Sequence, residues 1–119
     1  MPEIFLFYFF VEIKFRNCKF VNMVVISYGT LKAFYEVHSD AEEALNNWYR
    51  LAINSDWKQL ADIRSVFNSV DYVGNDRFVF NIRGNNYRLV AMIFFNIRTV
   101  FIRFVGTHAE YDRINCLTI

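Results

Sequence analysis

The feature that most constrains the fold is an alternation of side chains that runs from residue 77 to residue 104. Successive side chains of a strand point to opposite faces of a sheet, so a period of two indicates strands. The alternation predicts strands at residues 77–82, 87–94 and 99–104. Gly84-Asn85 suits a two-residue hairpin turn, and a four-residue loop joins the second strand to the third. We therefore expect three consecutive antiparallel strands.

These loop lengths fix which residues face each other. They place Arg88 opposite Asn81 and Arg103 opposite Val90. One face of the sheet is then uncharged and consists of Phe78, Phe80, Ile82, Tyr87, Leu89, Ala91, Ile93, Val100, Ile102 and Phe104. The other, which we call the arginine face, holds Arg77, Val79, Asn81, Arg83, Arg88, Val90, Met92, Phe94, Thr99, Phe101 and Arg103. A bulge in either pairing would move residues to the opposite face.

The residues before this sheet show a helical period instead. A short strand at Met23–Ile26 is followed by expected helices through Leu31–Val37, from Ser39 through Ala52, and over Asp56–Arg64. Their expected caps are Ser27 or Thr30, then Asp40, then Asp56. Thr107 can cap a short C-terminal helix. The predicted fold class is α+β, an antiparallel sheet with helices packed on its uncharged face.

The first 22 residues have a different character. Residues 4–11 are all apolar, but a membrane helix needs about 20 such residues, and no basic stretch precedes them as in a signal peptide. We expect residues 1–22 to be an apolar extension outside the native fold, with Met23 as the working start and 23–119 as the domain; an added edge strand is the alternative. No membrane association is expected. Cys18 and Cys116 suggest free thiols in a reducing cytoplasm.

Charge divides the body of the chain into two parts. Residues 23–76 carry four cations and eight acids, whereas residues 77–119 carry six cations and two acids. All six cations of the second part are arginines, whose planar guanidinium suits bidentate contacts with phosphate. A phosphate-rich partner and an ordinary solvated sheet face both fit this pattern.

The last strand is followed by a motif that could carry chemistry. His108 and Tyr111 lie three residues apart, so a helix would project both from one side. Both side chains can move protons, and His does so near neutral pH. In the alternative interpretation Tyr111 packs in the core and His108 only makes a capping contact.

Three stretches of this chain resemble the HigB-type toxins of bacterial type II toxin–antitoxin systems, relatives of RelE. They are Asp40–Leu45 with Trp48-Tyr49, Val79–Val90, and Phe104–Asp112. The resemblance implies a RelE-like fold. It also implies an endoribonuclease (mRNA interferase) that cleaves mRNA on the ribosome and inhibits translation. A HigA-like helix-turn-helix antitoxin would hold it inactive in a hetero-oligomeric complex.

RNA cleavage without a metal needs a base, an acid and cations that stabilise the phosphate. We expect His108 to transfer protons, Arg88 and Arg103 to stabilise the phosphate, and Tyr111 to stack on a base or orient a proton. The residues expected to position the RNA backbone are Arg83, Arg77, Lys58 and Asn81. Phe94 and Phe101 are candidate stacking rings. We expect no metal site and no cofactor; the alternatives are a non-catalytic ParE-like inhibitory module and an inactive remnant.

Overall fold

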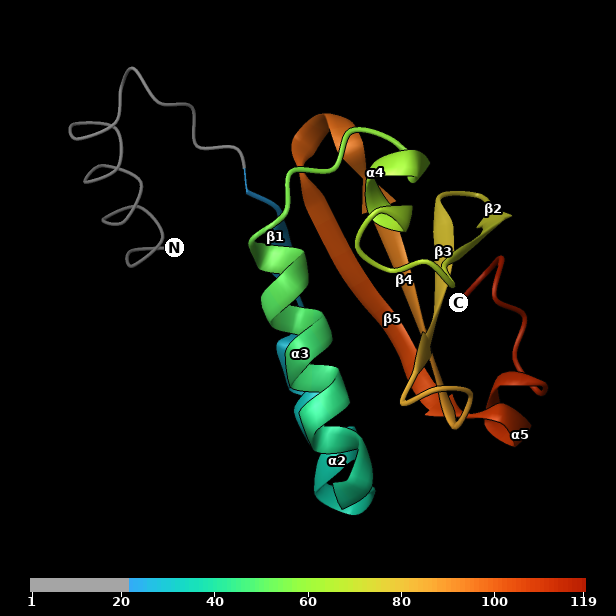
Figure 1. Cartoon of the computed structure of the whole chain (residues 1–119). Helices are drawn as coiled ribbons and strands as arrows, with labels where there is room; N and C mark the ends of the chain where they lie inside the picture. The colour runs from blue at the N-terminus through green and yellow to red at the C-terminus, as the bar shows by residue number, and fades with distance from the viewer. Residues whose placement is uncertain (1–21) are drawn as a thin grey trace.

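A computed structural model describes residues 22–119 (Figure 1). The expectations for residues 1–21, including the apolar run and Cys18, lie outside the described residues. The elements in chain order are β1 (Val24–Ile26), α2 (Tyr28–Val37), the 3-10 turn η1 (Ser39–Ala41), α3 (Glu42–Ile53), α4 (Leu60–Arg64), β2 (Asp71–Gly74), β3 (Arg77–Ile82), β4 (Tyr87–Phe94), the 3-10 turn η2 (Phe95–Ile97), β5 (Thr99–Thr107) and α5 (His108–Tyr111).

The strands form one sheet in the order β1-β5-β4-β3-β2. The α+β class and the antiparallel pairing of β3, β4 and β5 are confirmed. The sheet is larger than predicted, because β2 adds an antiparallel strand at one edge and β1 adds a parallel strand beside β5 at the other. No helix within the described residues is long and apolar enough to cross a bilayer.

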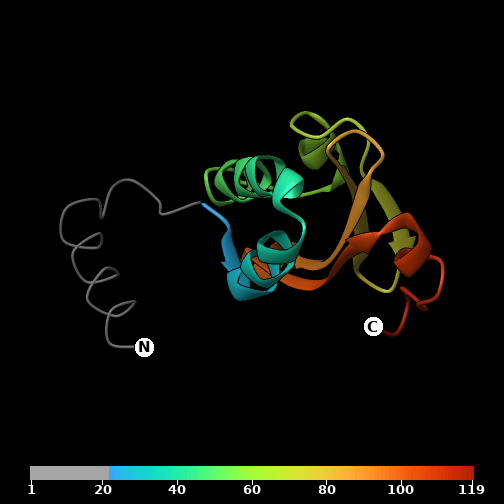
Figure 2. The same ribbon diagram turned by 90° about the horizontal axis from the view of Figure 1, so that it is seen from below.

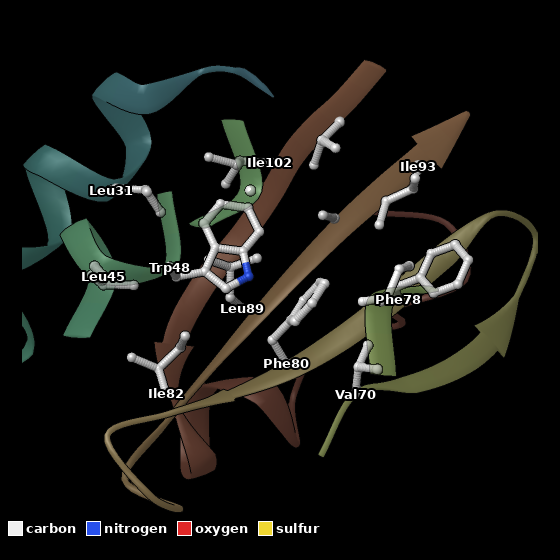
Figure 3. Close-up of a cluster of buried hydrophobic side chains, with 14 of the residues drawn as sticks. Leu31, Leu45, Trp48, Val70, Phe78, Phe80, Ile82, Leu89, Ile93 and Ile102 are labelled. Atoms are coloured by element: carbon white, nitrogen blue, oxygen red, sulfur yellow. The ribbon is translucent and has the colours of Figure 1, made fainter. Parts of the chain in front are cut away.

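The core lies between the uncharged face of the sheet and the helices (Figure 3). The α3 residues Leu45, Trp48 and Ala52 recur at helical spacing, and each is at most 1% exposed. Across from them, alternate residues of β3 and β4 point inward, among them Phe80 and Leu89. The spacing of apolar residues therefore changes from about 3.6 residues in the helices to two residues in the strands, because each element buries one face.

The pairing of β3 with β4 is as predicted, and Arg88 lies opposite Asn81. The pairing of β4 with β5 departs from the prediction halfway along. Ile102 lies opposite Ala91, but Phe104, not Arg103, lies opposite Val90. Arg103 is therefore the extra residue of a β-bulge. Beyond the bulge Phe104 lies on the arginine face, so its assignment to the core face was wrong.

Arg83 also differs from its expected position. The turn between β3 and β4 takes four residues, 83–86, and Arg83 has left the strand with a φ of 53°. Its guanidinium lies 3.5 Å from the carboxylate of Asp40, and Asp40 also accepts a 2.5 Å hydrogen bond from the hydroxyl of Tyr87. Tyr87 belongs to the core face, so Arg83 is turned toward the helices and not toward Arg88.

The side-chain capping hydrogen bonds expected at the first three helices do not form. Ser27 occupies the N-cap position of α2, but its side chain makes no capping hydrogen bond. Asp40 bonds Tyr87 instead of capping α3, which begins after Ala41. Asp56 pairs with Lys58 and Arg98, and α4 begins only at Leu60. Both carboxylates bind partners distant in the chain, which local capping rules do not consider.

Candidate active site

Arg88 lies in the middle of a cross-strand row near the start of β4. Its neighbours in the sheet are Asn81 on β3 and Gly106 on β5. The side chain is half-buried, and its Nε atom is buried without a hydrogen-bond partner among the described residues. The Nε–H of Arg88 can donate a hydrogen bond to a bound anion, because no internal hydrogen bond to that atom has to break first.

Tyr111 covers this arginine. The guanidinium carbon of Arg88 lies 4.8 Å from the centre of the Tyr111 ring, a cation–π contact. The Tyr111 hydroxyl lies 3.6 Å from the sulfur of Cys116, which is a free thiol. The alternative that Tyr111 packs in the main core was wrong, since Arg88 belongs to the opposite face of the sheet.

The surroundings of Tyr111 favour its neutral form. Partial burial raises the pKa of Tyr111 above its usual 10.0, and the hydrogen bond with Cys116 acts in the same direction, while Arg88 opposes both. The phenol therefore stays protonated at neutral pH. It can donate a hydrogen bond or a proton, but it does not act as a phenolate base.

A capping box holds α5 at the end of β5. The hydroxyl of Thr107 accepts a 3.1 Å hydrogen bond from the backbone N–H of Glu110, and the carboxylate of Glu110 accepts one of 2.8 Å from the backbone N–H of Thr107. The expected cap at Thr107 is confirmed. His108 is the first residue of α5, two residues beyond the partner of Arg88. Its Nε2 is buried without a hydrogen-bond partner among the described residues, so this atom makes no capping contact.

Gly106 provides the space that this arrangement needs. A Cβ at this position would lie 2.5 Å from the ring of Phe104 and 2.7 Å from a carboxylate oxygen of Glu110. Phe104 in turn approaches Tyr111, with ring centres 6.5 Å apart. Any side chain at position 106 would therefore disturb both the aromatic pair and the capping box.

Two further predicted residues share the arginine face but are already engaged. Arg77 is only 7% exposed and donates hydrogen bonds to the backbone oxygens of Asn75 and Ile119. Arg103 donates a 3.3 Å hydrogen bond from Nε to the same Ile119 oxygen. The C-terminal residues thus reach across the face on which we expected RNA to lie.

The remaining predicted positions are not brought to this cluster. Arg83 is paired with Asp40 on the helix side. Lys58 is exposed and paired with Asp56, which also binds Arg98 just before β5. Lys58 thus lies near the beginning of β5, whereas α5 follows its end. Phe94 and Phe101 also lie toward the beginning of β5, where their ring centres are 5.9 Å apart.

Two features of the site were not recognised in the sequence. Glu110 could have been found, because Thr-x-x-Glu is the pattern of a capping box. Phe104 could not, because its face depends on the bulge.

Among the described residues there is no group of three or more His, Cys, Asp or Glu side chains that could hold a metal ion. An open groove of about 520 Å³ lies between α2 and the end of β5, and none of the eight predicted site residues lines it.

The sequence was then compared with known families. The profile of a family described as HigB toxin, the RelE-like toxic component of a toxin-antitoxin system, matches residues 41–114. The chain belongs to the HigB toxin family. The match includes the Arg88–Tyr111 contact, the capping box and all eight residues predicted from the sequence.

Individual HigB proteins show the same relationship. The chain is 42% identical over 59 residues to the mRNA interferase toxin HigB of Escherichia coli K12, which is 47% of this chain and 56% of that protein. The mRNA interferase HigB of Shigella flexneri gives the same values. The mRNA interferase HigB of Escherichia coli O6:H1 is 32% identical over 73 residues, covering 60% of this chain and 71% of that protein. The chain thus spans about half the length of the first two relatives.

Proposed function

We propose that this member of the HigB family is an endoribonuclease that cleaves mRNA on the ribosome and so inhibits translation. The observation that carries the proposal is the contact between Arg88 and Tyr111 at the junction of β4, β5 and α5, with His108 three residues before Tyr111 on α5. It lies within the family match, and several relatives are named mRNA interferases. The cluster contains a cation and two groups that transfer protons.

The proposed chemistry is an internal attack within the RNA. The 2′-hydroxyl loses its proton and its oxygen attacks the adjacent phosphorus, while the 5′-oxygen leaves and takes up a proton. His108 is the proposed proton-transfer group, since its buried Nε2 has no internal partner. Arg88 stabilises the crowded phosphate. Tyr111, held neutral by partial burial, stacks on a base or donates a hydrogen bond.

The other arginine-face residues have supporting roles in this proposal. Asn81 is next to Arg88 across the sheet and can bond the RNA backbone there. Arg77 and Arg103 can hold the backbone farther along the face. Arg83 and Lys58 would contact the RNA only farther from Arg88, because both are paired with acids away from the cluster. We propose that no metal takes part in the reaction.

The family description names a toxin–antitoxin system, so this chain has an antitoxin as a partner. We propose a HigA-like helix-turn-helix protein that forms a hetero-oligomeric complex with this chain. We propose that the protein acts in the cytoplasm, where ribosomes and mRNA meet. An acidic segment of the antitoxin would be attracted to the arginine-rich half of the chain.

Primer extension on mRNA translated by purified ribosomes tests this proposal. The wild type should produce discrete cuts in the ribosome-bound mRNA, and His108→Ala should produce none. If the wild type and His108→Ala show the same absence of cuts, the nuclease assignment fails. Growth inhibition without cuts would then indicate a ParE-like inhibitory module, and no inhibition would indicate an inactive remnant.

A further inference from the structure

The C-terminal residues Asn115–Ile119, which we call the C-terminal strap, lie on the opposite side of the sheet from α3 (Figure 2). In Figure 1 they leave α5 and run back alongside the sheet toward β2 and β3. The Asn75 side chain donates a 2.8 Å hydrogen bond to the backbone oxygen of Leu117, and a methyl group of Leu117 faces Gly74. Ile119 then reaches Arg77 and Arg103.

The end of the strap occupies an unusual electrostatic position. Two guanidinium groups, from β3 and from β5, converge on the same oxygen atom of Ile119. No Asp or Glu side chain among the described residues forms an ion pair with either arginine, and the Nε of Arg77 is buried without a partner. One oxygen atom uses few of the donors that two arginines present.

A phosphodiester is a suitable ligand for these donors. It carries a full negative charge and two free oxygens, and arginine forms its strongest hydrogen bonds with such groups. Arg77 lies opposite Met92, four residues along β4 from Arg88, which corresponds to about 13 Å. A strand of RNA of a few nucleotides that has one phosphate at Arg88 can therefore place another between Arg77 and Arg103.

We propose that Arg77 and Arg103 form a phosphate subsite for single-stranded RNA, and that the strap occupies this subsite when RNA is absent. The inference rests on the proposed function and adds to it a place for the flanking RNA and a competitor within the chain. The strap is suited to leave, because most of its residues are exposed. Its turn is also held by hydrogen bonds within the strap, in which Leu117 and Thr118 donate to Asn115, and these can persist after the strap detaches.

The test loosens the strap without changing either arginine. Asn75→Gly removes the amide that holds Leu117, and glycine accepts the φ of 52° at this position. Leu117→Ser removes the apolar contact with Gly74. The matched control is Ile97→Ser, which also replaces an exposed apolar side chain but lies beside the beginning of β5. Arg103→Gln removes one cation of the subsite.

The probe is a fluorescent 2′-O-methyl RNA 12-mer, which lacks the attacking hydroxyl. We expect the double variant Asn75→Gly/Leu117→Ser to bind it several-fold more tightly than the wild type, and Ile97→Ser to bind it equally. Arg103→Gln should bind it less tightly and lower the slope of log K against log salt by about 0.7. An unchanged or weaker affinity of the double variant, at an unchanged melting temperature, overturns the proposal.

A measurement on the wild type removes any dependence on how the variants fold. In ¹⁵N relaxation, the heteronuclear NOE of Ile119 should fall when the RNA probe is added, because the strap is released. An unchanged or higher value shows that RNA binds without displacing the strap, and overturns the proposal. The cleavage assay separates the two levels of inference. If the wild type cleaves mRNA and the strap stays in place, only the strap proposal fails; if the strap is displaced and no cleavage occurs, only the nuclease assignment fails.

Discussion

Replacing Arg88 with alanine should remove the activity and leave the fold intact. The guanidinium contacts the Tyr111 ring, and a cation–π contact at a partly exposed site contributes about 0.5–1 kcal/mol to stability. The buried Nε makes no hydrogen bond within the described residues, so none is lost at that atom. For a domain of this size, a loss of about 1 kcal/mol corresponds to a fall in melting temperature of roughly 4–8 °C.

The effect on cleavage should be far larger. If Arg88 stabilises the charge that develops on the phosphate, its loss should resemble the loss of one oxyanion-hole donor, about 10²–10³-fold in rate. The assay is primer extension on ribosome-bound mRNA at fixed toxin concentration, together with thermal unfolding of each variant. The two measurements separate a catalytic contribution of several kcal/mol from a structural one of about 1 kcal/mol.

Two controls make this prediction refutable. Leu89→Ala changes the adjacent residue, which is fully buried, and should cost about 2–5 kcal/mol of stability. Arg50→Ala removes the same charge from an exposed position on α3 and should leave cleavage unchanged. If Arg88→Ala destabilises the protein as much as Leu89→Ala, Arg88 is structural. If it cleaves like Arg50→Ala, Arg88 does not stabilise the phosphate.

Three further predictions concern the surroundings of the site. Gly106→Ala should reduce cleavage at least tenfold by displacing Phe104 and Glu110, and wild-type rates for this variant would contradict the close packing. Glu110→Ala should cost about 1 kcal/mol of stability through loss of the capping box, whereas Glu110→Gln, which can still accept the hydrogen bond, should retain both stability and activity; equal losses in both variants would point to the charge instead. Lys58 and then Arg98 hold the pKa of Asp56 below its usual 3.8, so the stabilisation that this carboxylate provides is complete above about pH 3.8 and is lost as the pH falls through the lower folded-state value. Melting curves of wild type and Asp56→Asn recorded as a function of pH should therefore converge in acid, and parallel curves would contradict the shift.

The sequence predicts the two strands of the central hairpin to the residue, but not their turn or what surrounds them. The alternation of side chains fixes both the bounds of β3 and β4 and the pairing of Arg88 with Asn81, because one face must be buried. The same reasoning fails beyond Ile102, since alternation carries no information about a residue that a strand has in excess. The parallel strand β1 was predicted as a strand, but its pairing with β5 is set by tertiary structure.

The candidate site was predicted in part for a related reason. The sequence singles out Arg88, His108 and Tyr111, and the structure brings Arg88 and Tyr111 into contact because the end of β5 lies beside the start of β4. Arg83 was misplaced because its interaction with Asp40 joins residues more than forty positions apart. The C-terminal strap has no periodicity, and its path depends on Asn75, Arg77 and Arg103, so no local pattern could have placed it on the arginine face.

The bulge in β5 makes Arg103 a residue that the sheet could do without. Ile102 and Phe104 would alternate correctly if they were adjacent, as the residues on both sides of the bulge already occupy the faces of a regular strand. β5 therefore resembles a regular strand with one extra residue, Arg103, which adds a positive charge. Deleting Arg103 should give a shorter strand in which each remaining side chain keeps its partner on β4. A one-residue deletion normally moves every side chain beyond it to the opposite face of the sheet, but here it should leave both faces of β5 unchanged.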